Sequence, residues 1–153
     1  MLTKRGKYAL RALIYLARHR ARGLILIHEV AEKEQIPQKF LESILRDLRN
    51  EQIVRSKIGR GGGYELAKPP NKINLGEIIR PIEGSLVPMP CVNPAARQPC
   101  ADCPKTDLCM IRAIMREVDA AMAAILDQTT LQMLVHRAEA SEQQAIHSLH
   151  FEI

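Results

Sequence analysis

Tryptophan is absent from this chain, and aromatic residues make up only 3% of its 153 residues. Because 46% of the residues are nevertheless hydrophobic, the core must consist mainly of aliphatic side chains and Met. The sequence also lacks an apolar run long enough to cross a bilayer. No small-residue cleavage site follows its basic and apolar N-terminus, so we interpret that segment as an amphipathic helix of a cytoplasmic protein with no membrane partner.

Acidic residues are few in the first half of the chain. Residues 1–80 contain 17 Lys and Arg against 8 Asp and Glu, a net charge of +9, whereas residues 81–153 contain 5 and 9, a net charge of −4. A basic segment of this kind favours a polyanionic partner, and nucleic acid before membrane. A solvated basic surface remains the alternative. No Ser–His–Asp or paired-carboxylate arrangement is evident, so we do not expect an enzyme.

The first 51 residues predict three helices. Thr3 is a candidate N-cap for a helix ending at about Arg20, and a second helix covers about residues 28–34. A third follows over about residues 37–51, after a tight turn that ends in Pro37. Two short helices joined by a tight turn indicate a helix-turn-helix unit. The apolar stripe predicted for the third helix comprises Phe40, Leu41, Ile44, Leu45 and Leu48.

A β-hairpin is predicted directly after these helices. Residues 53–58 alternate like a strand, a glycine-rich turn covers residues 59–63, and residues 64–67 return as a second strand. A basic hairpin in this place is a wing, and Arg60 at its tip could enter the minor groove of DNA. Residues 24–27 are either a short strand or the lead-in to the second helix.

Basic residues of the helix-turn-helix unit and the wing are the candidate DNA contacts. Lys4, Arg5 and Lys7 lie in the first turn of a helix, where the helix dipole disfavours cations. Either contacts with DNA phosphates or the solubility of the N-terminus could explain cations at these positions. The candidates for reading bases are Gln38, Lys39, Glu42 and Ser43. The candidates for phosphate or groove contacts are Arg46, Arg49, Lys57 and Arg60.

The second half predicts mainly helix. A short helix over residues 74–82 has Asn74 as its cap, and a long amphipathic helix follows from about Thr106 to Asp127. Its apolar surface exceeds what one small domain can cover, so we expect a homodimer. The predicted fold is mainly α with a small β-hairpin wing. Its parts are a winged helix-turn-helix domain (1–84), a cysteine-rich loop (85–106), a dimerisation helix with a short helix after Thr130 (107–135), and a peripheral tail (136–153).

All four cysteines lie in one proline-rich loop, with the spacing C-x8-C-x2-C-x5-C from Cys91 through Cys100 and Cys103 to Cys109. Such a group can form disulfides, hold zinc or hold an iron–sulfur cluster. A reducing cytoplasm disfavours structural disulfides. Structural zinc usually has two close cysteine pairs and this loop has one, but spacing alone leaves zinc and a cluster open. A redox C-x2-C is disfavoured because no βαβ context surrounds it.

With these features the sequence resembles the Rrf2 family of bacterial transcription regulators. The matching positions are Leu2-Thr3-Lys4, Tyr8 to Leu13, Val30-Ala31-Glu32, Ile36-Pro37, Phe40-Leu41-Glu42, Ile44-Leu45, Leu48, the wing residues Gly59, Gly61 to Tyr64 and Leu66-Ala67, and Glu83-Gly84. The likeness covers about residues 1–135. It implies a winged-helix dimer joined through the long helix, and members with cysteines in this loop bind an iron–sulfur cluster.

Two departures from the family pattern concern the cluster. The family usually has three loop cysteines, which Cys91, Cys103 and Cys109 match, and takes a fourth ligand from elsewhere. The nitric-oxide branch has an acidic residue where this chain has Lys7, and the cluster-biogenesis branch has a His where it has Arg112. Cys100 is therefore the predicted fourth ligand, and we favour a [4Fe–4S] over a [2Fe–2S] cluster. In the wing, Ile58 replaces a frequent Arg.

The sequence therefore predicts a repressor that binds double-stranded DNA operators under the control of a cluster that senses iron, cluster status, oxygen or nitric oxide. Thr106 and Asp107, at the expected start of the long helix, would direct backbone N–H groups toward the anionic cluster. The alternatives are a winged-helix regulator with structural zinc or a thiol switch, and, less favoured, an electron-transfer protein.

Overall fold

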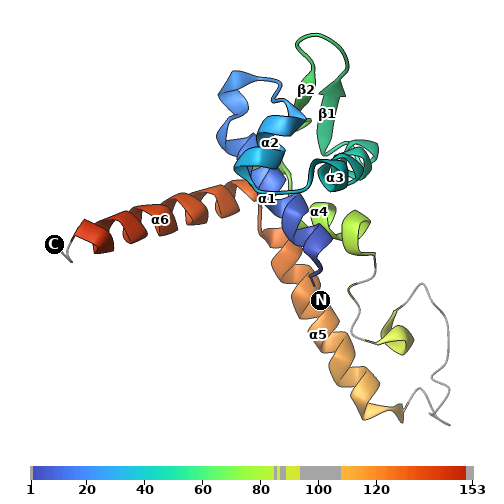
Figure 1. Ribbon diagram of the computed structural model, residues 1–153. Coiled ribbons are helices and arrows are strands. Elements are labelled where there is room, and N and C mark those ends of the chain that lie inside the picture. The colour runs from blue at the N-terminus through green and yellow to red at the C-terminus, as the bar shows by residue number, and fades with distance from the viewer. Residues whose placement is uncertain (1, 85, 87–88, 94–107, 151–153) are drawn as a thin grey trace.

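The computed structural model describes residues 2–84, 86, 89–93 and 108–150. Within these ranges the chain forms α-helices, short 3-10 helices labelled η, and one antiparallel hairpin. In chain order the elements are α1 Lys4–Arg18, η1 Arg20–Arg22, α2 Ile27–Lys33, α3 Gln38–Asn50, β1 Val54–Lys57, β2 Gly63–Leu66, η2 Pro70–Lys72, α4 Leu75–Glu83, η3 Pro90–Val92, α5 Met110–Gln128 and α6 Leu131–His150. The mainly α fold with a hairpin wing is confirmed. Figure 1 shows the wing and the free end of α5 at opposite ends of the molecule.

Helix α1 lies at the centre of the head and packs against α3, α4 and α6. Its start is capped as predicted, because Thr3 Oγ1 accepts from the backbone N–H groups of Arg5 and Gly6. The backbone N and the hydroxyl of Thr3 both donate to Glu83 Oε1 at 2.9 Å, which joins the start of α1 to the end of α4. Gly6 has to be small, since a Cβ there would lie 2.1 Å from the same oxygen.

The helix-turn-helix unit consists of α2, a turn over residues 34–37, and α3. Helix α3 buries Leu41, Ile44, Leu45 and Leu48 completely, as its periodicity predicts. Phe40 departs from the predicted stripe, because it is 37% exposed and makes an edge-to-face contact with Tyr8 of α1. The helix begins at Gln38, one residue later than expected, with Pro37 as its N-cap.

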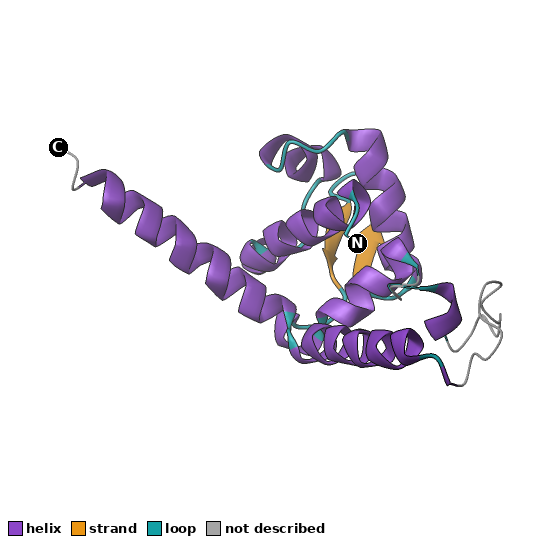
Figure 2. Ribbon diagram, turned by 90° about the horizontal axis from the view of Figure 1, so that it is seen from below, coloured by secondary structure: helices purple, strands orange, loops and turns teal. Residues whose placement is uncertain are grey.

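The wing pairs Val54 with Leu66 and Lys57 with Gly63. Gly59 and Gly61 adopt positive φ values of 96° and 76°, so the turn needs glycine there. One residue of the 24–27 segment joins the hairpin: Ile25 N donates to Tyr64 O at 2.9 Å, and Tyr64 N donates to Ile25 O at 2.8 Å. This bridge attaches the wing to the chain just before α2. In Figure 2, which is seen from below, the two strands appear behind the helices of the head.

The C-terminal helices differ in extent from the prediction. Helix α5 begins at Met110 rather than near residue 106, because Cys109 is the extended N-cap residue. Helix α6 continues to His150 rather than ending near Val135. Residues 136–150 contain no Gly or Pro and are rich in good helix formers, so their polarity did not prevent a helix. An ion pair between Arg18 of α1 and Glu142 joins this helix to the head.

Glu29 connects α2 to the two preceding elements. Its carboxylate accepts from both terminal nitrogens of Arg22 at 2.6 and 2.9 Å and from the Tyr15 hydroxyl at 2.8 Å. These hydrogen bonds, that of Arg22 first, lower the pKa of Glu29 to about 2. Because the pKa lies below that of the unfolded chain, this contribution to stability is present near neutral pH and is lost as the pH falls toward 2.

We therefore expect Glu29→Gln to lower the urea midpoint at pH 7, with a wild-type minus variant difference that shrinks between about pH 4.5 and 2. Urea unfolding followed by circular dichroism across this pH range measures it. Glu32→Gln removes a carboxylate from the exposed side of α2 and should keep the wild-type midpoint at pH 7. Equal midpoints for wild type and Glu29→Gln at pH 7 would contradict the prediction.

Candidate nucleic-acid interface and cysteine site

The outer face of α3 carries the side chains predicted to read bases. Gln38, Lys39 and Glu42 are exposed, and Gln38 Nε2 donates to Glu42 Oε1 at 3.1 Å. Arg46 and Arg49 are exposed farther along the same helix. The fold therefore presents this polar face outward as one surface, opposite the buried leucines and isoleucine.

Arg5 of α1 contacts side chains of α3. Its Nη2 donates to Ser43 Oγ at 3.0 Å and forms an ion pair with Asp47, and its guanidinium lies 5.7 Å from the centre of the Phe40 ring. The phosphate interpretation considered for the first turn therefore does not account for Arg5, which instead joins α1 to α3. Ser43 is half-buried and partly engaged by this contact. Lys4 and Lys7 remain exposed.

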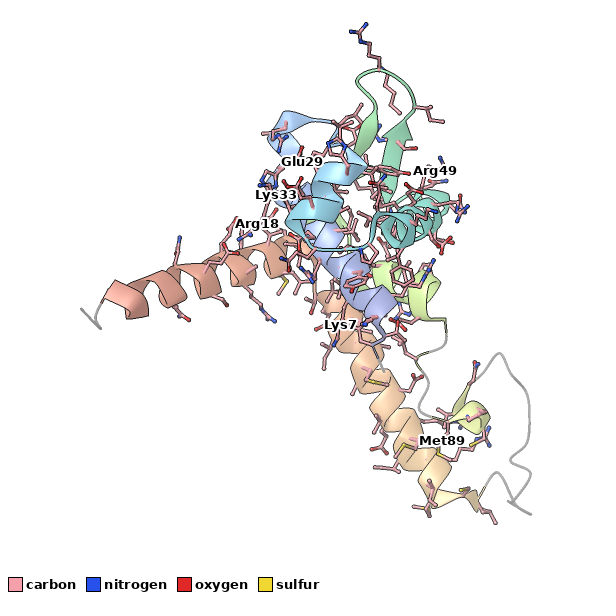
Figure 3. All side chains as sticks on the ribbon, viewed as in Figure 1. Lys7, Arg18, Glu29, Lys33, Arg49 and Met89 are labelled. Carbon is pink, nitrogen blue, oxygen red and sulfur yellow. The ribbon has the colours of Figure 1, made fainter. Side chains whose placement is uncertain are left out.

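The wing extends the basic surface of α3. Lys57 and Arg60 are exposed, and Ile58 between them is 90% exposed. Arg49 Nη1 donates to Ser56 Oγ of β1 at 3.3 Å, which links the end of α3 to the wing. Figure 3 shows Arg49 on the side of the head where α3 and β1 meet.

A groove of about 540 Å³ lies where α3 meets the wing. Among its lining residues are Arg49, Arg55 and Lys68. Sequence reasoning missed Arg55 and Lys68 as candidate phosphate contacts. Their signal was available, because both are cations at the ends of the predicted strands nearest to the recognition helix.

The described residues at both ends of the cysteine loop lie at α5. Cys91 lies in η3, which packs against α5, and Cys109 is the N-cap of α5. Val92, next to Cys91, is only 4% exposed and anchors η3. Figure 3 shows Met89, just before η3, beside α5. The predicted ligands Cys100 and Cys103 lie outside the described residues, as do Thr106 and Asp107.

Cys91 and Cys109 both lie near the start of α5, because Arg112 in the first turn of this helix contacts the backbone of Cys91. Both are half-buried. The first-turn N–H groups of α5 follow Cys109 directly, so the positive end of the helix dipole lies next to this residue. The long helix begins at Met110, about four residues later than predicted. Within the described ranges, no three side chains of His, Cys, Asp or Glu form a metal-binding group by themselves.

A stripe of large apolar side chains on α5 is exposed. None of the residues of α5 is buried within the single chain. We call this set the α5 stripe, and it comprises Met110, Ile111, Ile114, Val118 and Ile125, which are between 40% and 79% exposed. It continues into an apolar hollow of about 290 Å³ lined by Leu2, Ile79, Leu86, Met122, Ile125 and Leu126. An exposed apolar surface of this kind is typical of a protein–protein interface.

Comparison with known proteins identifies the family of this arrangement. Residues 2–137 match the Rrf2 family, described as iron-dependent transcriptional regulators. The chain belongs to the Rrf2 family. The rrf2-like protein of Rhodobacter capsulatus is 40% identical over 135 residues, which are 86% of this chain and 90% of that protein. The resemblance based on sequence motifs is thus confirmed.

Solved structures of Rrf2 proteins have the same fold. IscR of T. potens superposes with a TM-score of 0.73 at 28% identity and covers 92% of this chain and 90% of its own. CymR of B. subtilis, described as the global cysteine regulator, superposes with a TM-score of 0.72 at 28% identity and covers 90% and 97%.

As an Rrf2 member, this chain is a bacterial transcriptional regulator and not an enzyme. It binds DNA and acts as a dimer, as expected from its basic head and from the α5 stripe. No helix in the part of the chain that the structure describes is long and apolar enough to cross a membrane.

Proposed function

We propose that this Rrf2 protein is a cytoplasmic repressor whose operator binding is controlled by a [4Fe–4S] cluster on Cys91, Cys100, Cys103 and Cys109. The observation that carries the proposal is the placement of Cys91 and Cys109 at one end of α5, with all the cysteines of the chain between residues 91 and 109. The description of the family as iron-dependent supports iron over zinc. Four thiolates from one chain are a sufficient ligand set for such a cluster.

The outer face of α3 and the wing form the proposed DNA surface. We assign base reading to Gln38, Lys39, Glu42 and Ser43, since polar side chains on a recognition helix meet base edges in the major groove. Phosphate and groove contacts are assigned to Arg46, Arg49, Lys57 and Arg60, which are all exposed. Arg55 and Lys68 extend this basic surface along the groove at the base of the wing.

The coupling between the two sites follows from the chain order. When bound, the cluster supplies an anionic centre that reacts with oxygen and nitric oxide. Ligation through Cys91 and Cys109 holds η3 on the start of α5, and α5 carries the dimer contact. The heads of the dimer must match half-sites about 34 Å apart, so a small change in the placement of α5 alters operator affinity. We therefore divide the chain into a head (1–84), a sensor loop (85–106), a dimerisation region (107–135) and a peripheral C-terminal segment (136–153).

Anaerobic purification followed by iron, acid-labile sulfide and zinc analysis tests the cofactor. We expect about four iron and four sulfide per chain and a broad visible absorption band. The holo and apo proteins should then differ in affinity for a duplex selected by the holo protein from a random-sequence library. Stoichiometric zinc without sulfide would overturn the cluster, and equal affinities would overturn its control of DNA binding.

The wing assignment predicts a change in salt dependence. Lys57→Ala and Arg60→Ala should each reduce the slope of log affinity against log salt by about one unit, because each removes one phosphate contact. Fluorescence anisotropy with one duplex at several salt concentrations measures the slope. Lys72→Ala is the matched control, because Lys72 lies outside the wing. It belongs to η2, which packs against α6. Unchanged slopes for both wing variants would show that the wing does not contact phosphates.

A second candidate function is a thiol switch without a cluster. The similarity to CymR, described as the global cysteine regulator, favours it. In that case the purified protein holds neither iron nor sulfide, and its operator affinity changes on thiol oxidation and returns with a reductant. The metal and sulfide analysis distinguishes the two functions directly.

A further inference from the structure

Arg112 connects the two described ends of the cysteine loop. It lies three residues after Cys109, so its side chain projects from the same side of the first turns of α5. Its Nε donates to the backbone oxygen of Cys91 at 3.1 Å, across 21 positions of sequence. Together with buried Val92, this hydrogen bond holds Cys91 on the helix that begins at Cys109.

The chemistry of an arginine suits this place in two ways. A guanidinium is planar and donates in fixed directions, so it holds a carbonyl oxygen in a defined place. It also has no acceptor atom, so it cannot ligate iron. A positive charge bonded to the backbone of Cys91 and three residues from Cys109 would offset part of the negative charge of a four-thiolate site. Arg112 is half-buried, which makes this charge more effective than one in bulk water.

We propose that Arg112 is a positioning residue for the cluster, an inference that rests on the proposed function. Its hydrogen bond presents Cys91 to the site that contains Cys109, and its charge stabilises the reduced, more negative state of the cluster. Two effects follow for the loaded protein. The cluster is retained longer than it would be without Arg112, and its reduction potential is higher.

The test uses the anaerobically purified full chain with Arg112→Gln and Arg112→Lys. Loss of visible absorption in the presence of an iron chelator gives the rate of cluster release, and a redox titration of the same band gives the potential. Loss of partners around metal ligands typically weakens a site by about 10- to 100-fold, so we expect Arg112→Gln to release the cluster at least about tenfold faster and to have a lower potential. Arg112→Lys should release it faster, because the planar donor is lost, while its potential stays close to that of wild type.

Arg116→Gln is the matched control. Arg116 is exposed one turn farther along α5, so its loss removes the same charge from the same helix. This variant should keep the wild-type release rate and potential. If the Arg112→Gln protein holds a full cluster and has the wild-type release rate and reduction potential, the role proposed for Arg112 is wrong while the cluster function stands. A wild-type protein without iron and sulfide would overturn the proposed cluster function, and with it this inference. If Arg112→Lys, which keeps the charge, lowers the reduction potential as much as Arg112→Gln, which removes it, the charge of Arg112 does not set the potential.

Discussion

Replacing Cys109 with alanine should reduce the iron and sulfide content of the anaerobically purified protein by about tenfold or more. Loss of a residue that merely supports a metal ligand already costs about 10- to 100-fold in affinity, and a ligand itself should cost at least as much. Cys109 is also the N-cap of α5, so the positive end of the helix dipole would face the negative charge of a cluster held there. Metal and sulfide analysis together with the visible spectrum measures the loss.

Leu108→Ala provides the control for this experiment. Leu108 precedes Cys109, is 74% exposed and has no metal-binding group, so its variant should retain the full cluster. The far-ultraviolet circular dichroism of all variants should match that of wild type. A Cys109→Ala protein with wild-type iron and sulfide would exclude Cys109 as a ligand. The same measurement on Cys100→Ala decides the fourth ligand, since a retained cluster would remove Cys100 from the set.

Placing a carboxylate in the α5 stripe should separate the dimer. Ile114 is 50% exposed in the single chain and lies in the middle of the stripe, so a partner helix packed on the stripe would bury the carboxylate introduced by Ile114→Glu. Burial of an unpaired charge costs about 3 kcal/mol or more. This corresponds to an increase of more than about 100-fold in the dimer dissociation constant. Sedimentation velocity at micromolar concentrations measures the shift to monomer.

The Ile114→Glu variant should affect DNA binding and cluster binding differently. Operator affinity should fall, because one head alone contacts only one half-site. Cluster content should remain at the wild-type level, since all four proposed ligands belong to one chain. Ala120→Glu is the matched control, because Ala120 is exposed on the side of α5 opposite the stripe and should leave the dimer intact. A fully dimeric Ile114→Glu protein would exclude this part of the stripe from the interface.

Local sequence rules identified most elements of the head. Thr3 and Asn74 cap α1 and α4 as predicted, and Asn74 Oδ1 accepts from Glu77 N at 2.8 Å. The glycine-rich turn of the wing and the buried stripe of α3 also follow the prediction. These features depend on hydrogen bonds and periodicities within a few residues, so the order of residues along the chain is enough to reveal them.

Features that depend on distant residues escaped prediction. The contacts of Arg5 with Ser43 and Asp47 join positions about 40 residues apart, and no local pattern marks them. Phe40 has the spacing of a core residue, yet it is 37% exposed and contacts Tyr8 and Arg5 of α1 instead of joining the buried core. The extent of α6 was underestimated because polarity was weighed above helix propensity.

By itself the sequence determined the family, the basic head, the cysteine spacing and the amphipathic character of the long helix, because these depend on residue types and on short-range order. Only the tertiary structure decided that η3, which contains Cys91, packs against α5 and that Arg112 donates to the backbone of Cys91, since that contact spans the whole loop. It also decided which cations are engaged internally, as Arg5 is, and which remain exposed, as Lys57 and Arg60 do. These contacts depend on how the helices and strands pack against one another, and the periodicity of the sequence does not encode that packing.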